Sequence, residues 1–262
     1  MLGKLLKYDL KSLFKAIIPL YLFVVLSAVF TIIAYKLGWN FTIFQILKFT
    51  FSTLFVISIL VVLIFSFFIG VRRFYQNMLK DEGYLTNTLP IKKSSLIFSK
   101  LLASIIVMIC STIICLLAII LIELRSFDIS QLNSEVVPGI NGYGLAALII
   151  IVAITQMMAY LSSFYNALSL GHKHSNNKMI FSIIYGIVIY VAIQVISSIG
   201  LIIFLNLANY GSLVTMEFST SNSNISTLML QMFGFAVIAN IIYTTINFIM
   251  TKITLKNNLN LE

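Results

Sequence analysis

The sequence contains very little charge for its length. Of its 262 residues only 10% are charged, whereas 60% are hydrophobic, and the mean hydropathy is +1.04. Water-soluble domains carry about 25% charged residues, so this composition excludes a soluble globular protein. The composition indicates a single integral membrane domain that is solvated by lipid.

Several catalytic signatures are also missing. The sequence contains no G-x-x-x-x-G-K-[ST] phosphate loop, so we do not expect this chain to hydrolyse ATP by that route. It contains neither H-E-x-x-H nor G-x-S-x-G, the usual hydrolase signatures. No charged residue lies deep in an expected span, where ion-coupled carriers need one. We therefore expect a chain that is not an enzyme and whose driving energy comes from elsewhere.

Cysteine and histidine are scarce. Cys110 and Cys115 share one apolar run but face different sides of a helix, so we expect no internal disulfide. The only histidines are His172 and His174, and no carboxylate or thiol lies near them. Their spacing therefore indicates a solvated turn rather than a metal site, and we expect no metal or cofactor on this chain.

Apolar runs of membrane length make up most of the sequence. A helix needs about 20 such residues to cross a bilayer, and six runs qualify: 16–35, 49–71, 101–122, 143–166, 179–205 and 228–250. With the N-terminus inside, 14 of the 17 Lys and Arg residues fall in inner segments. This bias predicts cytoplasmic termini, and it assigns the net charge of +9 to membrane orientation rather than to nucleic-acid binding. We expect an all-α integral membrane protein with six transmembrane helices.

Residues 1–15 precede the first run and are amphipathic. Leucines recur at helical spacing on one face, and the opposite face carries Lys4, Lys7, Lys11 and Lys15. This pattern predicts a basic helix that lies in the interface plane, although a simple positive-inside anchor would carry the same charges. Pro19 is expected in the first turn of the span, where its missing N–H costs little.

The segment before the sixth run has mixed polarity. Residues 206–227 begin apolar and end in STSNSNIST, and the fifth run is longer than one crossing needs. Both observations favour a re-entrant element between spans five and six. A tilted long helix followed by a flexible loop explains the same pattern.

Polar residues lie on single faces of the uncharged spans four, five and six. Hydrogen bonds between helices are the simpler explanation. The functional explanation is a translocation path that admits an amphipathic cargo. Its candidate lining residues are Gln156, Tyr160, Gln194, Ser198, Asn240 and Thr244.

The longest charged interruption covers residues 72–100 and holds six basic residues. The second span should continue as a helix through Leu79, the segment Asp81-Glu82-Gly83 should break it, and Pro90 disfavours helix in the residue before it. Tyr84 and Leu85 are apolar side chains framed by charges. Such a segment suits the transmission of force from a soluble partner, and a plain hairpin loop is the alternative.

The pattern FYQNMLKDEGYLTNTLPIKKSSLIFSKLL in this loop resembles the cytoplasmic loop between spans two and three in permease subunits of ATP-binding-cassette exporters of the type V fold. The resemblance implies a half-transporter that pairs with a second copy or a sister permease. It also implies a separate ATPase subunit that holds ATP and Mg²⁺. The coupling helix that docks on this ATPase would lie within 80–90, at Lys80, Asp81, Glu82, Gly83, Tyr84, Leu85 and Pro90.

The small, Lys-, Ile- and Asn-rich form looks similar to bacterial permeases that expel amphipathic peptides, such as phenol-soluble modulins or lantibiotics. The resemblance therefore implies a bacterial plasma membrane and an amphipathic or antimicrobial peptide as cargo. A stand-alone channel or carrier, and a membrane-embedded enzyme, are the alternatives. The residues fix neither the cargo nor the choice between homodimer and heterodimer.

Overall fold

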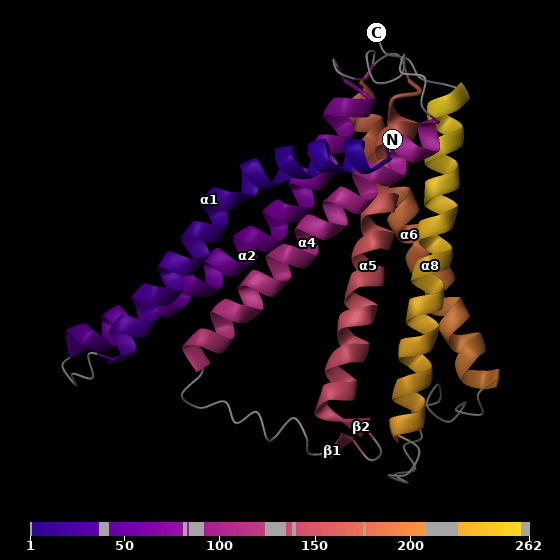
Figure 1. Ribbon diagram of the computed structural model, residues 1–262. Helices are drawn as coiled ribbons and strands as arrows, with labels where there is room; N and C mark the ends of the chain where they lie inside the picture. The colour runs from indigo at the N-terminus through magenta and orange to yellow at the C-terminus, as the bar shows by residue number, and fades with distance from the viewer. Residues whose placement is uncertain are drawn as a thin grey trace. The chain divides into compact units, whose positions relative to one another are not determined.

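The computed structural model describes residues 2–36, 42–80, 83, 92–123, 135–137, 140–174, 177–207 and 225–257. Within these residues, six helices are long and apolar enough to cross a membrane (Figure 1). They are α1 (Leu2–Lys36), α2 (Thr42–Met78), α4 (Lys93–Glu123), α5 (Gly142–Gly171), α6 (Lys178–Leu207) and α8 (Ile225–Asn257). The fold is thus that of a helical, multi-pass membrane protein.

The helices are longer than a bilayer requires. α1, α2 and α4 have 35, 37 and 31 residues, whereas the hydrocarbon core needs about 20. Much of the excess lies in 2–15, 72–78 and 93–100, which precede or follow the expected spans. As the sequence predicted, the second span continues beyond Arg73, and its helix ends at Met78.

Residues 2–15 do not form a helix of their own. They run without a break into the first span as part of α1, so the predicted separate interfacial helix is not confirmed. Pro19 lies in the interior of α1, and the prediction that it occupies a first turn was wrong. An interior proline removes one backbone hydrogen bond and bends the axis. Figure 1 shows α1 changing direction along its course.

A short strand pair departs from the all-α expectation. β1 (Glu135–Val137) and β2 (Ile140–Asn141) pair antiparallel, with Glu135 opposite Asn141. The sequence between them is Pro138-Gly139, two residues that favour tight turns. Strands of two and three residues are too short to show the alternation from which a strand is predicted.

The re-entrant element predicted within 206–227 cannot be compared with the structure. Residues 208–224 lie outside the described part of the chain, between the end of α6 and the start of α8. The prediction therefore stays a prediction.

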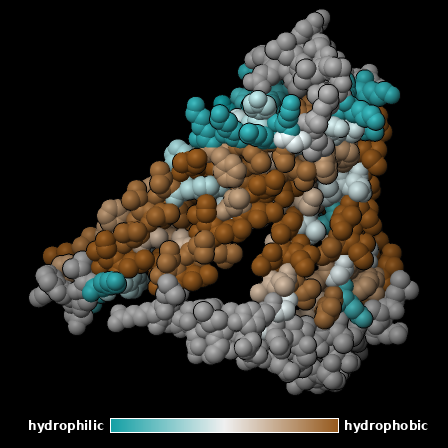
Figure 2. Space-filling view, in the orientation of Figure 1, coloured by the Kyte–Doolittle hydropathy of each residue, from teal (hydrophilic) through white to brown (hydrophobic). Residues whose placement is uncertain are grey.

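The helices group into two compact units, and each is described by itself. In unit 1 (Met1–Met78 and Thr88–Phe127), α1, α2 and α4 all pack against one another. In unit 2 (Leu79–Asn87 and Asp128–Glu262), α5 packs against both α8 and α6. Figure 2 shows hydrophobic residues along the helices and hydrophilic residues mainly near helix ends, as a lipid environment requires.

One stripe of α1 forms the centre of unit 1. Its buried residues recur every three or four positions, the spacing of one helix face: Leu13, Ile17, Tyr21, Val24 and Ala28. The stripe meets Phe55, Val62 and Ile69 of α2 and Ala103, Val107 and Cys115 of α4. Hydroxyl pairs join the same helices, with Ser27 Oγ 2.9 Å from Ser58 Oγ and Tyr21 Oη 2.8 Å from Ser111 Oγ.

Candidate functional site

A buried ion cluster lies at one end of unit 1. Asp9 of α1 accepts from Arg73 Nε of α2 at 3.3 Å, and from Lys100 Nζ of α4 at 3.3 Å. Lys100 Nζ is also 3.5 Å from the second carboxylate oxygen. The side chains of Asp9 and Lys100 are only 6% and 4% exposed, so water screens this pair little. One carboxylate therefore ties together all three helices of the unit.

Helix geometry explains why Asp9 reaches its partners. Asp9 lies one turn before Leu13 and two turns before Ile17, in line with the buried stripe of α1. The lysines of 4–15 lie on the other side and are exposed. Arg73 lies in the last turns of α2 and Lys100 about two turns into α4. In the sequence, the two cations therefore bracket the segment 79–92.

Asp9 was not among the residues predicted from the sequence. Its partners are 64 and 91 residues away, so no local motif contains the cluster. The sequence nevertheless contained a signal for a buried ion pair at Asp9. Asp9 is the only acidic residue before Asp81, and it falls on the apolar face of an amphipathic helix. A charged residue at a core position is rarely buried without a partner.

Most of the predicted docking residues cannot be placed. Asp81, Glu82, Tyr84, Leu85 and Pro90 lie outside the described residues. Lys80 is exposed, while Gly83 is buried and donates its backbone N–H to the carbonyl of Lys80 at 2.6 Å. The chain therefore turns directly after α2, where the sequence predicted that the helix would end.

A seam of uncharged polar side chains joins α5 and α8 in unit 2. Asn166 Nδ2 donates to Asn247 Oδ1 at 2.9 Å, and Asn247 Nδ2 donates to the carbonyl of Tyr243 at 2.9 Å and to Ser163 Oγ at 3.3 Å. About two helical turns further along, Asn240 Nδ2 is 3.5 Å from Thr155 Oγ1. These bonds join the two helices without the cost of burying charge. Among the described residues, Asn166 Oδ1 is buried and has no hydrogen-bond partner.

The six predicted pathway residues occupy different surroundings. Asn240 is buried in this seam, and Thr244 donates to the Asn240 carbonyl at 2.7 Å. Gln156 is half-buried and Tyr160 is 41% exposed on α5. Gln194 and Ser198 are exposed on α6. Among the described residues, no hydrogen bond joins the α6 pair to the predicted residues of α5 or α8.

The turn between α5 and α6 is packed rather than solvated, so that expectation was wrong for His172. Its ring is buried and its Nδ1 donates to the carbonyl of Leu168 at 2.8 Å. Burial is the main reason why the pKa of His172 is lowered; the charge of Lys178 lowers it further, and the bond to Leu168 opposes both. His172 is therefore neutral near pH 7.

The second histidine and a glycine complete this turn. His174 stacks on Phe181, with ring centroids 4.0 Å apart, and its Nε2 is 3.2 Å from Tyr185 Oη. A Cβ atom on Gly171 would lie 2.5 Å from the backbone nitrogen of Ser182 and 2.6 Å from its Cα. Only glycine lets α5 and α6 approach this closely. Nowhere in the described chain do three or more metal-binding side chains gather.

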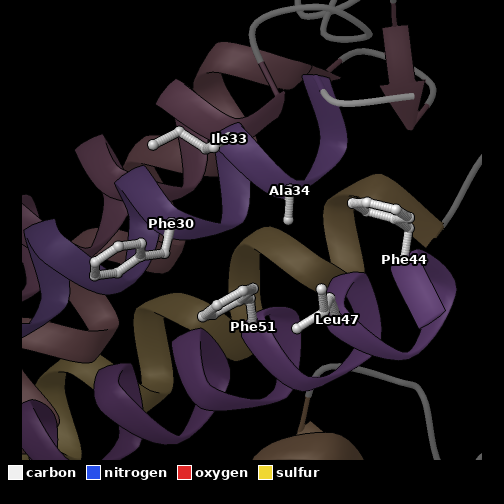
Figure 3. Close-up of a pocket in the computed structure, with 6 residues that line it drawn as sticks. All are labelled: Phe30, Ile33, Ala34, Phe44, Leu47 and Phe51. Carbon is white, nitrogen blue, oxygen red and sulfur yellow. The ribbon is translucent and has the colours of Figure 1, made fainter. Parts of the chain in front are cut away.

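A small apolar cleft of about 80 Å³ opens between α1 and α2 in unit 1 (Figure 3). Its lining residues are Phe30, Ile33, Ala34, Phe44, Leu47 and Phe51. The rings of Phe30 and Phe51 stack with centroids 5.7 Å apart. With no polar side chain in its wall, the cleft suits hydrocarbon and offers no catalytic chemistry.

Comparisons with protein-family models, with curated proteins and with solved structures found no match to this chain.

Proposed function

We propose that this chain is the non-catalytic permease subunit of an ATP-binding-cassette exporter. It would form half of a translocation pathway for an amphipathic peptide. The segment around Lys80–Pro90 would dock a separate ATPase subunit, which would hold ATP and Mg²⁺. A second copy or a sister permease would supply the other half of the pathway.

The observation that carries this proposal is the Asp9 cluster. The helices on either side of segment 79–92 each place a cation on the same carboxylate of α1. A force applied to that segment by a soluble motor would therefore move α1, α2 and α4 together. Rigid-body movement of packed helices is a common form of transport switching.

The exposed face of α6 supports the second subunit. Tyr190, Gln194 and Ser198 recur every four residues near the middle of α6, and all three are exposed. In the described chain no hydrogen bond involves the side-chain amide of Gln194, although its backbone carbonyl accepts from Ser197 Oγ. An amide without a partner costs several kcal/mol in hydrocarbon, which favours contact with another subunit or with a hydrated path.

The proposal is tested by capture of the tagged full-length chain from its native membranes. Mass spectrometry should identify an ATP-binding-cassette ATPase in stoichiometric amount, and ATP hydrolysis by the complex should be measurable. Tyr84→Ala with Leu85→Ala should abolish the capture. The control variant is Ile33→Ala with Tyr35→Ala. It removes one aliphatic and one tyrosine side chain near the C-terminal end of α1, far from segment 79–92 in the sequence, and it should preserve the capture of the ATPase.

The alternatives predict other results. A stand-alone channel or carrier would conduct or transport in liposomes without nucleotide and would be captured without an ATPase. An intramembrane enzyme would convert a substrate alone. Either result, or equal capture by both double variants, would refute the docking assignment.

The peptide cargo rests on the resemblance of the loop and is tested by ATP-dependent uptake of amphipathic peptides into inverted vesicles.

A further inference from the structure

The exposed lysines of α1 form a narrow stripe. At about 100° per residue, Lys4, Lys7, Lys11 and Lys15 fall within an arc of about 80°, and all four are exposed. Asp9, the only acidic residue of α1, lies on the opposite side and is occupied by Arg73 and Lys100. No side chain of α1 therefore offsets the charge of the stripe.

The same face continues along the apolar part of the helix. Ile18, Leu22, Val25, Val29 and Ile33 share the arc of the lysines by the same count, and each is 45–60% exposed. These aliphatic side chains lie in the membrane-length segment Gly3–Lys36, so lipid acyl chains are what they meet in a bilayer. The lysine stripe is thus in line with a lipid-facing stripe of one continuous helix.

The depth of Lys11 and Lys15 agrees with this alignment, whereas Lys7 and Lys4 lie about 16 and 21 Å of helix before Ile18, further toward the water. Lys15 and Lys11 precede Ile18 by about 5 and 10 Å of helix at 1.5 Å per residue. The headgroup layer on each side of the hydrocarbon core is about 5–8 Å thick, and a lysine side chain reaches several ångströms along the helix to place its ammonium group. Tyr8 is 70% exposed beside the stripe.

We propose that Lys4, Lys7, Lys11 and Lys15 form a binding face for the headgroups of anionic phospholipids, in the leaflet that meets the N-terminal end of α1. The occupant is a phospholipid rather than a protein, because its acyl chains would lie on the aliphatic continuation of the same face. The stripe selects anionic over zwitterionic headgroups by charge. This inference does not depend on the transporter proposal.

The test uses the full-length protein in neutral detergent. Native mass spectrometry measures the apparent Kd of the first bound phosphatidylglycerol and phosphatidylcholine molecules. Each lysine near an anionic surface contributes about fivefold in binding, so Lys7→Gln/Lys11→Gln/Lys15→Gln should weaken phosphatidylglycerol binding at least tenfold. Phosphatidylcholine binding should change less than twofold.

The matched control is Lys173→Gln/Lys252→Gln/Lys256→Gln, which removes the same charge from exposed lysines of unit 2. This variant should keep the wild-type preference for phosphatidylglycerol. Equal weakening in both triple variants would show an effect of net charge alone and would overturn the assignment. Equal binding of the two lipids by the wild type would also overturn it and would leave the stripe as a surface for a protein.

Discussion

Unit 1 and unit 2 each contain three membrane-length helices, but different chemistry joins the helices in each. In unit 1 a carboxylate and two cations join the helix ends, and hydroxyl pairs and an apolar core join the spans. In unit 2 the α5–α8 seam contains only amides and hydroxyls. A larger share of span residues is buried in unit 1 than in unit 2.

The difference follows from the environment of each group. Asp9 and its partners lie in the parts of the helices that extend beyond the expected spans, where headgroups and water lower the cost of charge. Asn166 and Asn247 lie within or beside the apolar runs, where a neutral amide is much less costly than an ion. The low burial of α6 leaves most of its surface free of contacts within unit 2.

The largest effect is expected when unit 1 loses its shared carboxylate. Asp9→Leu removes the charge that Arg73 and Lys100 both contact, and breaking a buried ion pair costs about 3–5 kcal/mol. Unfolding in detergent, followed by circular dichroism, should show this loss. Adding Lys100→Met should restore part of the stability, because a well-packed apolar pair can replace a buried ion pair. Full additivity of the two losses would contradict the pairing.

The second largest effect is expected in unit 2, at the α5–α6 turn. Gly171→Ala places a methyl group against the backbone of Ser182, and overpacking of this kind costs about 1–3 kcal/mol. Gly186→Ala is the control, since its nearest neighbour would be Ala167 Cβ at an ordinary 3.7 Å. Thermal unfolding should separate the two variants. Equal stability would mean that the close approach of the helices is not required.

A moderate effect is expected in the amide seam. Asn247→Ala removes three hydrogen bonds, and such bonds average about 0.6 kcal/mol each in lipid, so we expect a loss of about 1–2 kcal/mol. Asn206→Ala, which removes only a bond to the carbonyl of Ile202, should lose less. Unfolding of both variants in a lipid-containing micelle provides the comparison. A larger loss in Asn206→Ala would contradict the role of the seam.

The smallest effect concerns pH. Burial lowers the pKa of His172 in the folded state, so the unfolded chain binds a proton more readily than the folded one. Its ordinary pKa is about 6.5, and the stability of unit 2 should therefore be constant above that pH and fall below it. His172→Asn keeps a donor for the Leu168 carbonyl and should reduce this dependence. An unchanged pH profile would exclude His172 as its source.

The sequence predicted the six spans because hydrophobic runs of membrane length are a direct property of composition. It also predicted that the second helix continues beyond its span over 72–78, because these residues are not apolar but follow the preceding helix without a break signal. Residues 2–15 were assigned correctly as helical, yet their continuity with the span depends on packing of Asp9 and Leu13 into unit 1.

The parts that were missed depend on contacts distant in the sequence or on exact turn geometry. The role of Asp9 depends on its ion pairs with Arg73 and Lys100. These partners are too distant in the sequence for a spacing rule to connect them to Asp9. His172 continues the hydrogen-bonding pattern of α5, since its backbone N–H is 3.2 Å from the Leu168 carbonyl and its ring bonds the same carbonyl. Neither fact follows from periodicity.

We propose that the Asp9 cluster passes movement of segment 79–92 to the three helices of unit 1. The most direct test of this coupling is the ratio of peptide transported to ATP hydrolysed by the purified complex in liposomes, for wild type and Asp9→Asn. Asparagine keeps an oxygen for Arg73 and Lys100 but removes the charge. We predict that the Asp9→Asn complex still binds its ATPase and hydrolyses ATP, with a ratio at least tenfold lower. An unchanged ratio would contradict the account.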